Sequence, residues 1–167
     1  MTHPLPTIYR DTRERKPWHL LDGGRCVYED VALYVGDYAL AEFCTLDGNA
    51  WVPSFVIERK APPDYLGSFF PSPTDEYNKM RKGYAKGVKM MYVLDGSEVD
   101  LRRELNRAHW KRFRNGRGLQ WPEVSAQIQS LRVAGIHIIM SPSRHHAETT
   151  SFDLMMADAT RRRKGAK

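Results

Sequence analysis

The sequence predicts an α/β fold in one domain over residues 1–167, and its periodicity and composition support this prediction. The first half alternates short apolar runs with turn residues, whereas the second half carries longer segments of helical periodicity. At 167 residues the chain has room for one ordinary domain, and 41% hydrophobic residues are enough to form a core. We find no internal repeat and no low-complexity linker that would divide the chain.

Strands are expected where short apolar runs end at turn residues. In chain order they cover residues 7–10, 31–35, 51–60, 90–94 and 136–140. The second run ends at Gly36-Asp37, the third at Ala61-Pro62-Pro63-Asp64 and the fourth at Asp95-Gly96. Glycine, proline and aspartate interrupt regular strands, so these boundaries have a chemical cause.

Helices are expected between and after the later strands. One begins near Pro63 and Asp64, because proline is favoured in a first turn and aspartate at a cap. Residues 74–86 place Tyr77, Met80 and Tyr84 on one apolar face. Further helices cover 122–133 and 147–160, and a frayed basic tail follows over 161–167. The predicted order is β-β-β-α-β-α-β-α.

Charge and composition indicate the partner and the compartment. The chain has 26 Lys and Arg against 20 Asp and Glu, a net charge of +6, which suits nucleic acid or leaves a solvated basic surface. No apolar run approaches the roughly 20 residues of a membrane-spanning helix, and the N-terminus lacks a secretory pattern. We therefore expect a cytoplasmic protein with no membrane contact. Cys26 and Cys44 have no CxxC spacing, which excludes a disulfide framework and a four-cysteine zinc site.

The segment from Phe55 to Lys60 carries the clearest chemical signal. Because strand side chains alternate between faces, Glu58 and Lys60 must share one face. A bound Mg²⁺ or Mn²⁺ would offset the cost of burying this pair, since both ions prefer oxygen ligands. Asp37, expected at the end of the preceding strand, adds a second carboxylate if the two strands form a hairpin. Together these residues match the D...ExK arrangement of metal-dependent phosphodiester cleavage; the alternative is a charged strand end beside a turn.

Motifs in this order resemble those of the XPF-type nuclease domain. They are Asp11-Thr12-Arg13-Glu14, then Gly36-Asp37, then Glu58-Arg59-Lys60 followed by three residues and Asp64. The family signature is Gly-Asp and, at a variable distance, Glu-Arg-Lys, three residues and Asp. Segments 66–68, 92–94 and 138–141 agree further, so the resemblance covers the chain from about Ile8 to Ala159.

The resemblance implies a restriction-endonuclease-like core, with a central mixed β-sheet flanked by α-helices, and an endonuclease site that depends on Mg²⁺ or Mn²⁺. Asp37 and Glu58 are expected to bind the metal, with Asp11 close to it. Lys60 is expected to position the attacking water or help to deprotonate it. Asp64 lies at the final motif position, where the residues alone also allow a helix cap.

Two arginines of these motifs are expected near DNA. The resemblance places Arg13 opposite the scissile phosphate. Arg59 either contacts DNA or, because it alternates to the other face of the strand, braces the site or a neighbouring acid. Structural and functional roles stay equally open for Glu14.

The chain also departs from the family pattern. The arginine and glutamine usual after the final motif are replaced here by residues 70–76. We also expect no helix-hairpin-helix module. A basic insertion at about 97–118 lengthens the connection between the fourth and fifth strands. Its candidates for phosphate contact are Arg107, Lys111, Arg112 and Arg114, with Trp110 stacking on an unpaired base. The alternative is an amphipathic helix with Trp110 packed inward.

Together these observations predict an endonuclease acting on branched DNA or on single-strand/double-strand junctions, in DNA repair or recombination. The alternatives are a restriction-like or RNA-directed nuclease on the same core, and a catalytically idle DNA-binding subunit. Two copies could pair through a face of the last helix, although amphipathicity does not separate a dimer face from a core face. That face comprises Phe152, Met155, Met156 and Ala159.

Overall fold

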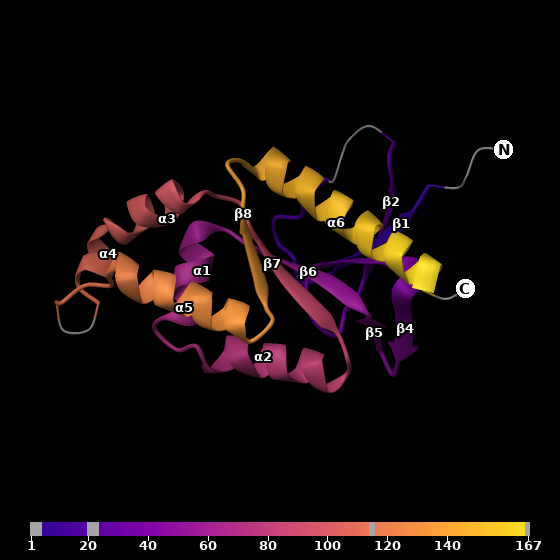
Figure 1. Ribbon diagram of the computed structural model, residues 1–167, viewed down its shortest axis with the longest axis horizontal. Coiled ribbons are helices and arrows are strands. Elements are labelled where there is room, and N and C mark those ends of the chain that lie inside the picture. The colour runs from indigo at the N-terminus through magenta and orange to yellow at the C-terminus, as the bar shows by residue number, and fades with distance from the viewer. Residues whose placement is uncertain (1–4, 20–23, 114–115, 166–167) are drawn as a thin grey trace.

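A computed structural model describes residues 5–19, 24–113 and 116–165. Its centre is a six-stranded sheet with the order β2-β1-β3-β6-β7-β8 (Figure 1). Neighbouring strands are parallel in the pairs β1/β2, β6/β7 and β7/β8 and antiparallel in β1/β3 and β3/β6. The strands are β1 Thr7–Asp11, β2 Val27–Val31, β3 Tyr38–Leu40, β6 Phe55–Lys60, β7 Lys89–Leu94 and β8 His137–Met140. The sheet is therefore mixed, as predicted.

Helices cover both faces of this sheet, because alternate residues of its central strands are apolar on both sides. On one face, α6 packs against Ile57 of β6 and Val93 of β7. On the other face, α1, α2, α3 and α5 pack against Tyr92 and Leu94 of β7. The helices are α1 Pro62–Phe69, α2 Thr74–Ala85, α3 Glu98–Leu105, α4 Ala108–Lys111, α5 Trp121–Val133 and α6 Arg144–Gly165. This arrangement confirms the α/β class with a central sheet flanked by helices.

A separate hairpin of β4 Cys44–Asp47 and β5 Ala50–Pro53 follows the short 3-10 helix η1 Ala41–Phe43. It packs on the β1 end of the sheet, where the Trp51 ring lies 4.9 Å from that of Tyr9. The predicted strand over 51–60 is therefore wrong in one respect, because Ser54 divides it between this hairpin and β6. The three-residue β3 was not predicted.

The second strand was predicted too late in the chain. β2 ends at Val31, and residues 32–35 contribute only an isolated bridge between Leu33 and Trp51. The Leu33 N–H donates instead to the Asp11 carboxylate at 2.8 Å, so a side chain takes the place of a neighbouring strand. This segment connects two strands.

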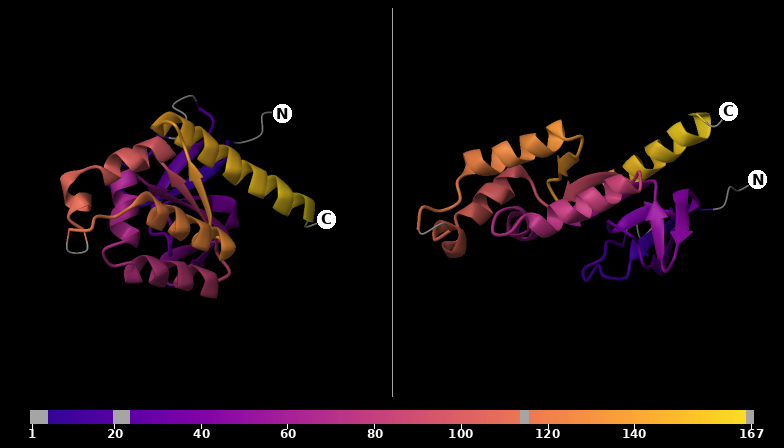
Figure 2. Two further views of the ribbon diagram at one scale, coloured as in Figure 1. Left: turned by 60° about the vertical axis from the view of Figure 1, so that its left-hand side comes forward. Right: turned by 90° about the horizontal axis from the view of Figure 1, so that it is seen from below.

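The predicted frayed tail is also wrong within the residues described, because α6 continues to Gly165. Arg161 and Arg162 both bind the buried carboxylate of Asp158, and Arg163 pairs with Glu42 at 2.5 Å. These ion pairs hold the last turns in helical form. Figure 2 shows α6 as one long helix running to the C-terminal end. None of the helices in the described ranges is apolar enough over a sufficient length to cross a membrane.

Candidate active site

Asp37 lies where three strands meet. It immediately precedes β3, which runs antiparallel to β6, so Asp37 stands at the start of a strand and not at the end of one as predicted. Its N–H donates to the Ile57 carbonyl at 2.9 Å, and its carbonyl accepts from the Asp11 N–H at 2.9 Å. Its side chain accepts from the Arg59 N–H at 2.7 Å. Bonds to β1 and β6 thus fix the position of this carboxylate.

Gly36 makes this placement sterically possible. Its φ of +80° lies in the left-handed region that glycine adopts readily. A Cβ at this position would lie 2.1 Å from Cγ2 of Val56, well inside van der Waals contact. The Gly-Asp motif is therefore a backbone requirement as well as a chemical one.

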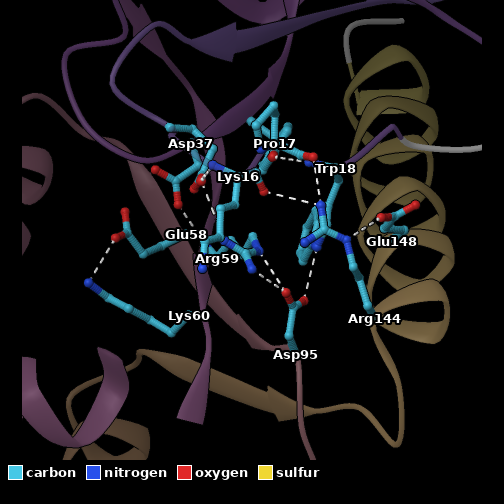
Figure 3. A network of polar contacts seen from close by, with 12 residues as sticks. Lys16, Pro17, Trp18, Asp37, Glu58, Arg59, Lys60, Asp95, Arg144 and Glu148 are labelled. Atoms are coloured by element: carbon cyan, nitrogen blue, oxygen red, sulfur yellow. Dashed lines mark hydrogen bonds and ion pairs between the residues drawn. The ribbon is translucent and has the colours of Figure 1, made fainter. Parts of the chain in front are cut away.

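Glu58 and Lys60 share one face of β6, as their alternation predicted. The Lys60 Nζ lies 3.3 Å from Oε1 of Glu58 (Figure 3). It also donates to Glu76 at 3.0 Å and to the Ser68 hydroxyl at 3.2 Å. Burial lowers the pKa of Lys60, but the charges of Glu58 and Glu76 outweigh burial and raise it overall. This shift favours the ammonium form of Lys60, which donates hydrogen bonds.

Two residues of α2, Glu76 and Lys79, contact the Glu58 and Lys60 pair, and sequence analysis identified neither of them. Glu76 is only 7% exposed and accepts from the Tyr92 hydroxyl at 2.6 Å as well as from Lys60. Lys79 places its Nζ 2.5 Å from Oε1 of Glu58. The available signal was an acid and a lysine three residues apart on a predicted helix, which puts them on one face.

The apolar face predicted for α2 is confirmed for Met80 and wrong for its two tyrosines. Tyr77 and Tyr84 are exposed, whereas the buried positions are Glu76, Met80 and Gly83. The face of α2 that meets the sheet thus carries a carboxylate, and Lys60 and Tyr92 satisfy it.

The residues present fit a divalent cation. Burial and the negative charge of Glu58 raise the pKa of Asp37 well above its ordinary value, against the opposing charge of Lys79. A cation between the two carboxylates would relieve their repulsion. Oε2 of Glu58 is buried and finds no hydrogen-bond partner among the described residues. Within those residues no group of three or more His, Cys, Asp or Glu side chains could hold a metal. A cation here would take two carboxylates and complete its shell with water or phosphate oxygens, as Mg²⁺ commonly does.

The carboxylate of Asp11, expected to lie close to the metal, is bound by other groups of the protein. Its carboxylate accepts from the N–H groups of Arg13 and Leu33, each at 2.8 Å, and from two nitrogens of the Arg13 side chain. These four bonds occupy both oxygens, so the expected metal contact is not supported for Asp11. Asp11 instead orients Arg13, whose side chain is 67% exposed at the site.

Arg59 points away from Glu58 and Lys60, to the other face of β6 (Figure 3). It pairs with Asp95 at 2.6 Å and with Glu14 at 3.4 Å, and its side chain is only 8% exposed. The Trp18 indole N–H donates to the same Asp95 carboxylate at 2.9 Å. The expected contact of Arg59 with DNA is therefore wrong, and the bracing alternative describes it. Glu14 belongs to the same structural network.

Asp64 lies in the first turn of α1 and is exposed. The N-cap of this helix is Ala61, so Asp64 is not the cap that its position suggested. Its side chain lines the same cleft as Glu58 and Lys60. Asp64 is thus available at the opening of the site.

These residues line a cleft of about 480 Å³, called here the active-site cleft. The carboxylates of Asp11 and Glu58 are buried, whereas Asp64 and the basic residues Arg13, Arg15 and Lys16 are exposed. Its lining comprises Asp11, Arg13, Glu14, Arg15, Lys16, Gly36, Asp37, Glu58, Arg59, Lys60, Asp64 and Lys79. This distribution suits a cation held by carboxylates with a phosphate group beside it.

The basic insertion and the last helix differ from two expectations. Trp110 is only 4% exposed and lies in the core with α3 and α5, so its predicted stacking on a base is wrong. Arg107 pairs with Glu104 at 2.9 Å, Lys111 and Arg112 are exposed, and Arg114 lies outside the described residues.

The predicted pairing face of α6 packs on its own sheet as part of the core. Its residues are Phe152, Met155, Met156 and Ala159.

Comparisons with known proteins agree with this geometry. The family model described as the ERCC4 domain matches residues 10–152. XPF from Aeropyrum pernix is similar in structure, with a TM-score of 0.62 and 18% identity over 92% of this chain and 65% of that one. Its complex with DNA gives a TM-score of 0.61 and 18% identity over 93% and 66%. This chain thus spans slightly less than two thirds of those chains.

No curated protein matches the sequence. The structural likeness at 18% identity establishes the fold, and the family model covers most of the chain independently of it. The chain belongs to the ERCC4 domain family.

Proposed function

We propose that this chain is an endonuclease that hydrolyses phosphodiester bonds in DNA with the help of Mg²⁺ or Mn²⁺. The observation that carries the proposal is the buried, unpartnered Oε2 of Glu58 beside Asp37, in a cleft with basic side chains around it. A buried carboxylate oxygen without a donor is costly, and a cation removes that cost. Membership of the ERCC4 domain family supports the same reaction.

Asp37 and Glu58 would hold the cation. When bound, it supplies Lewis-acid stabilisation of charge on the phosphate and makes water more acidic. Lys60, protonated between Glu58 and Glu76, donates a hydrogen bond to the attacking water or to a phosphate oxygen. Arg13, which Asp11 holds at the site, neutralises the phosphate from the other side. The attack is in line with the bond that breaks.

The preferred substrate is DNA that contains a branch or a single-strand/double-strand junction. The complex of XPF from Aeropyrum pernix with DNA supports DNA as the partner, and the choice of branched DNA rests on the motifs that this chain shares with XPF-type nucleases. The cleft is open and lined by charged residues, which suits a phosphate backbone better than a small apolar ligand.

One observation favours a second candidate, a DNA-binding subunit without cleavage. Lys79 lies 2.5 Å from Glu58 and supplies positive charge where a cation would otherwise do so. If this ion pair persists with Mg²⁺ present, Lys79 neutralises the negative charge of Glu58 and no metal ion is needed there. The side chain of Lys79 is 31% exposed, so it has room to swing out when a cation enters.

The test is cleavage of labelled flap, fork, four-way junction, duplex and single-stranded DNA, with Mg²⁺, Mn²⁺ or EDTA. We expect cleavage at junctions that EDTA abolishes and that Glu58→Gln removes. Glu42→Gln is the matched control, because this exposed glutamate pairs with Arg163 outside the cleft. Binding of all substrates without cleavage in either metal would support the idle subunit, and cleavage of RNA alone would overturn the choice of substrate.

A further inference from the structure

A second cleft lies between α3, α4 and the start of α5, and shares no lining residue with the active-site cleft. Its volume is about 390 Å³. Three cations line it, and no carboxylate does among the residues that the structure describes. The polar and aromatic lining groups are Arg102, Asn106, Lys111, Arg117, Gln120 and Trp121. We call it the α3–α5 cleft.

A buried side chain and backbone hydrogen bonds beneath this cleft fix the position of its lining residues. Trp110 is buried in the core, and its carbonyl accepts from the Leu119 N–H at 3.0 Å. The Phe113 carbonyl accepts from the Gly118 N–H at 2.9 Å. These bonds tie the segment leading into α5 back onto α4. Lys111 and Arg117 are therefore presented from anchored backbone.

The cations are available to a ligand. Arg102 and Arg117 pair with Glu98 and Glu123, at 2.6 and 2.8 Å, and these are exposed ion pairs that contribute little net stability. The Arg102 guanidinium lies 4.1 Å from the Trp121 ring centroid, which restrains the arginine over a flat apolar surface. A polyanion can replace the two glutamates as the partner of both arginines.

We infer that the α3–α5 cleft is a second binding site for the phosphate backbone of DNA, separate from the site of cleavage. Arginine, lysine, asparagine and glutamine are the side chains that commonly contact phosphates, and all four line this cleft. The net charge of +6 favours the same partner. The inference concerns binding, so it does not depend on the proposed hydrolysis.

The position of α3 relates the two clefts. This helix begins just after Asp95, whose carboxylate pairs with Arg59 behind the active site. Its eight residues span about 12 Å at about 1.5 Å per residue. This helix thus runs from the end of β7 to the α3–α5 cleft.

The experiment is fluorescence anisotropy of the full chain with DNA in EDTA, across a salt series. The variant is Arg102→Gln, Lys111→Gln, Arg117→Gln. The control variant is Lys86→Gln, Lys89→Gln, Arg132→Gln, which removes the same charge from exposed positions outside both clefts. With a duplex of about 20 base pairs, we expect the log-log salt slope of the first variant to fall by about 0.9 for each phosphate that it no longer neutralises. The control variant should keep nearly the full slope.

Equal losses in the two variants, or an unchanged slope in the first, would overturn the inference. Thermal melting verifies folding, and the double variant Lys111→Gln, Arg117→Gln retains the Arg102 contact with Trp121. If the slope falls but no substrate is ever cleaved, this site stands and the proposed hydrolysis fails.

Discussion

The two faces of β6 carry charge networks of opposite character. On one face, Arg59 lies between Asp95 and Glu14, and Trp18 donates to the same acid. On the other face, Glu58 keeps one buried oxygen without a partner. Both faces are polar at the same end of one strand and contribute residues to the lining of the active-site cleft, but only the Glu58 face keeps a carboxylate oxygen without a partner among the described residues.

This difference separates a face that stabilises the strand from a face that can bind a ligand. The Arg59 face is internally satisfied, so a ligand has nothing to add to it. The Glu58 face has an excess of carboxylate, which Lys60 and Lys79 balance only in part. A strand that alternates such side chains can therefore brace itself on one side and bind a cation on the other.

The largest expected effect is loss of cleavage from changes on the open face. Glu58→Gln and Lys60→Ala should each reduce cleavage by at least about 100-fold, because each removes charge that the transition state uses. Binding in EDTA should change little, since phosphate contacts elsewhere dominate it. Single-turnover assays and anisotropy measure the two quantities. Wild-type cleavage by either variant would show that the site is assigned to the wrong residues.

Changes on the closed face should instead act on stability. Asp95→Ala leaves the buried Arg59 without its main partner and should cost about 3–5 kcal/mol in the free energy of unfolding. The melting temperature should fall by roughly 6–20 °C. Arg10→Gln breaks the exposed pair with Asp30 and should cost at most about 1 kcal/mol. Similar losses from both variants, measured by urea unfolding, would contradict the contrast.

Glu76 tests how the open face holds its lysine. Glu76→Leu removes the acceptor of both Lys60 and Tyr92, and hydrogen bonds to charged groups are worth about 1.5–3 kcal/mol. We expect kcat to fall about 10- to 100-fold with little change in KM, because Lys60 loses its position. Glu76→Gln keeps an acceptor oxygen and should restore part of the activity. Equal activity of the two variants would leave Glu76 a purely structural residue.

The smallest effect concerns metal affinity. Lys79 competes with a cation for Glu58, and a partly exposed ion pair is worth up to about 1 kcal/mol. Lys79→Gln should therefore tighten Mn²⁺ binding by up to about fivefold.

Saturating metal, at about 100 times its dissociation constant, should stabilise the fold by about 2.7 kcal/mol. Titration calorimetry and melting curves measure both. The Asp37→Asn, Glu58→Gln double variant should lose the shift, and a retained shift would place the metal elsewhere.

Alternation along β6 made one part of the site predictable. It placed Glu58 and Lys60 together and sent Arg59 to the other face, and the structure agrees. Asp37 was identified as a carboxylate of the site but assigned to the wrong end of a strand. The cause is that β3 has only three residues, too few to show a period, and its pairing with β1 and β6 joins distant segments.

Burial decided the cases in which sequence analysis was wrong. Trp110 stands among arginines, which suggested an exposed ring, but α3 and α5 cover it. Glu76 was not selected as a site residue, because the sequence analysis placed its neighbour Tyr77 on the buried face; Lys60 and Tyr92 make the burial of Glu76 stable instead. Neither local pattern contains the distant residues that determine the outcome.

The glycine before Asp37 affects how active members of the family can be recognised. Gly36 has no room for even one carbon, because Val56 occupies that space. A relative that kept Asp37, Glu58 and Lys60 but replaced Gly36 would have to displace either the strand or the acid. Such a sequence would look intact by its charged residues, yet its aspartate would not occupy the position seen here. If the three charged residues act as proposed, a small residue before the aspartate is a fourth requirement of the site.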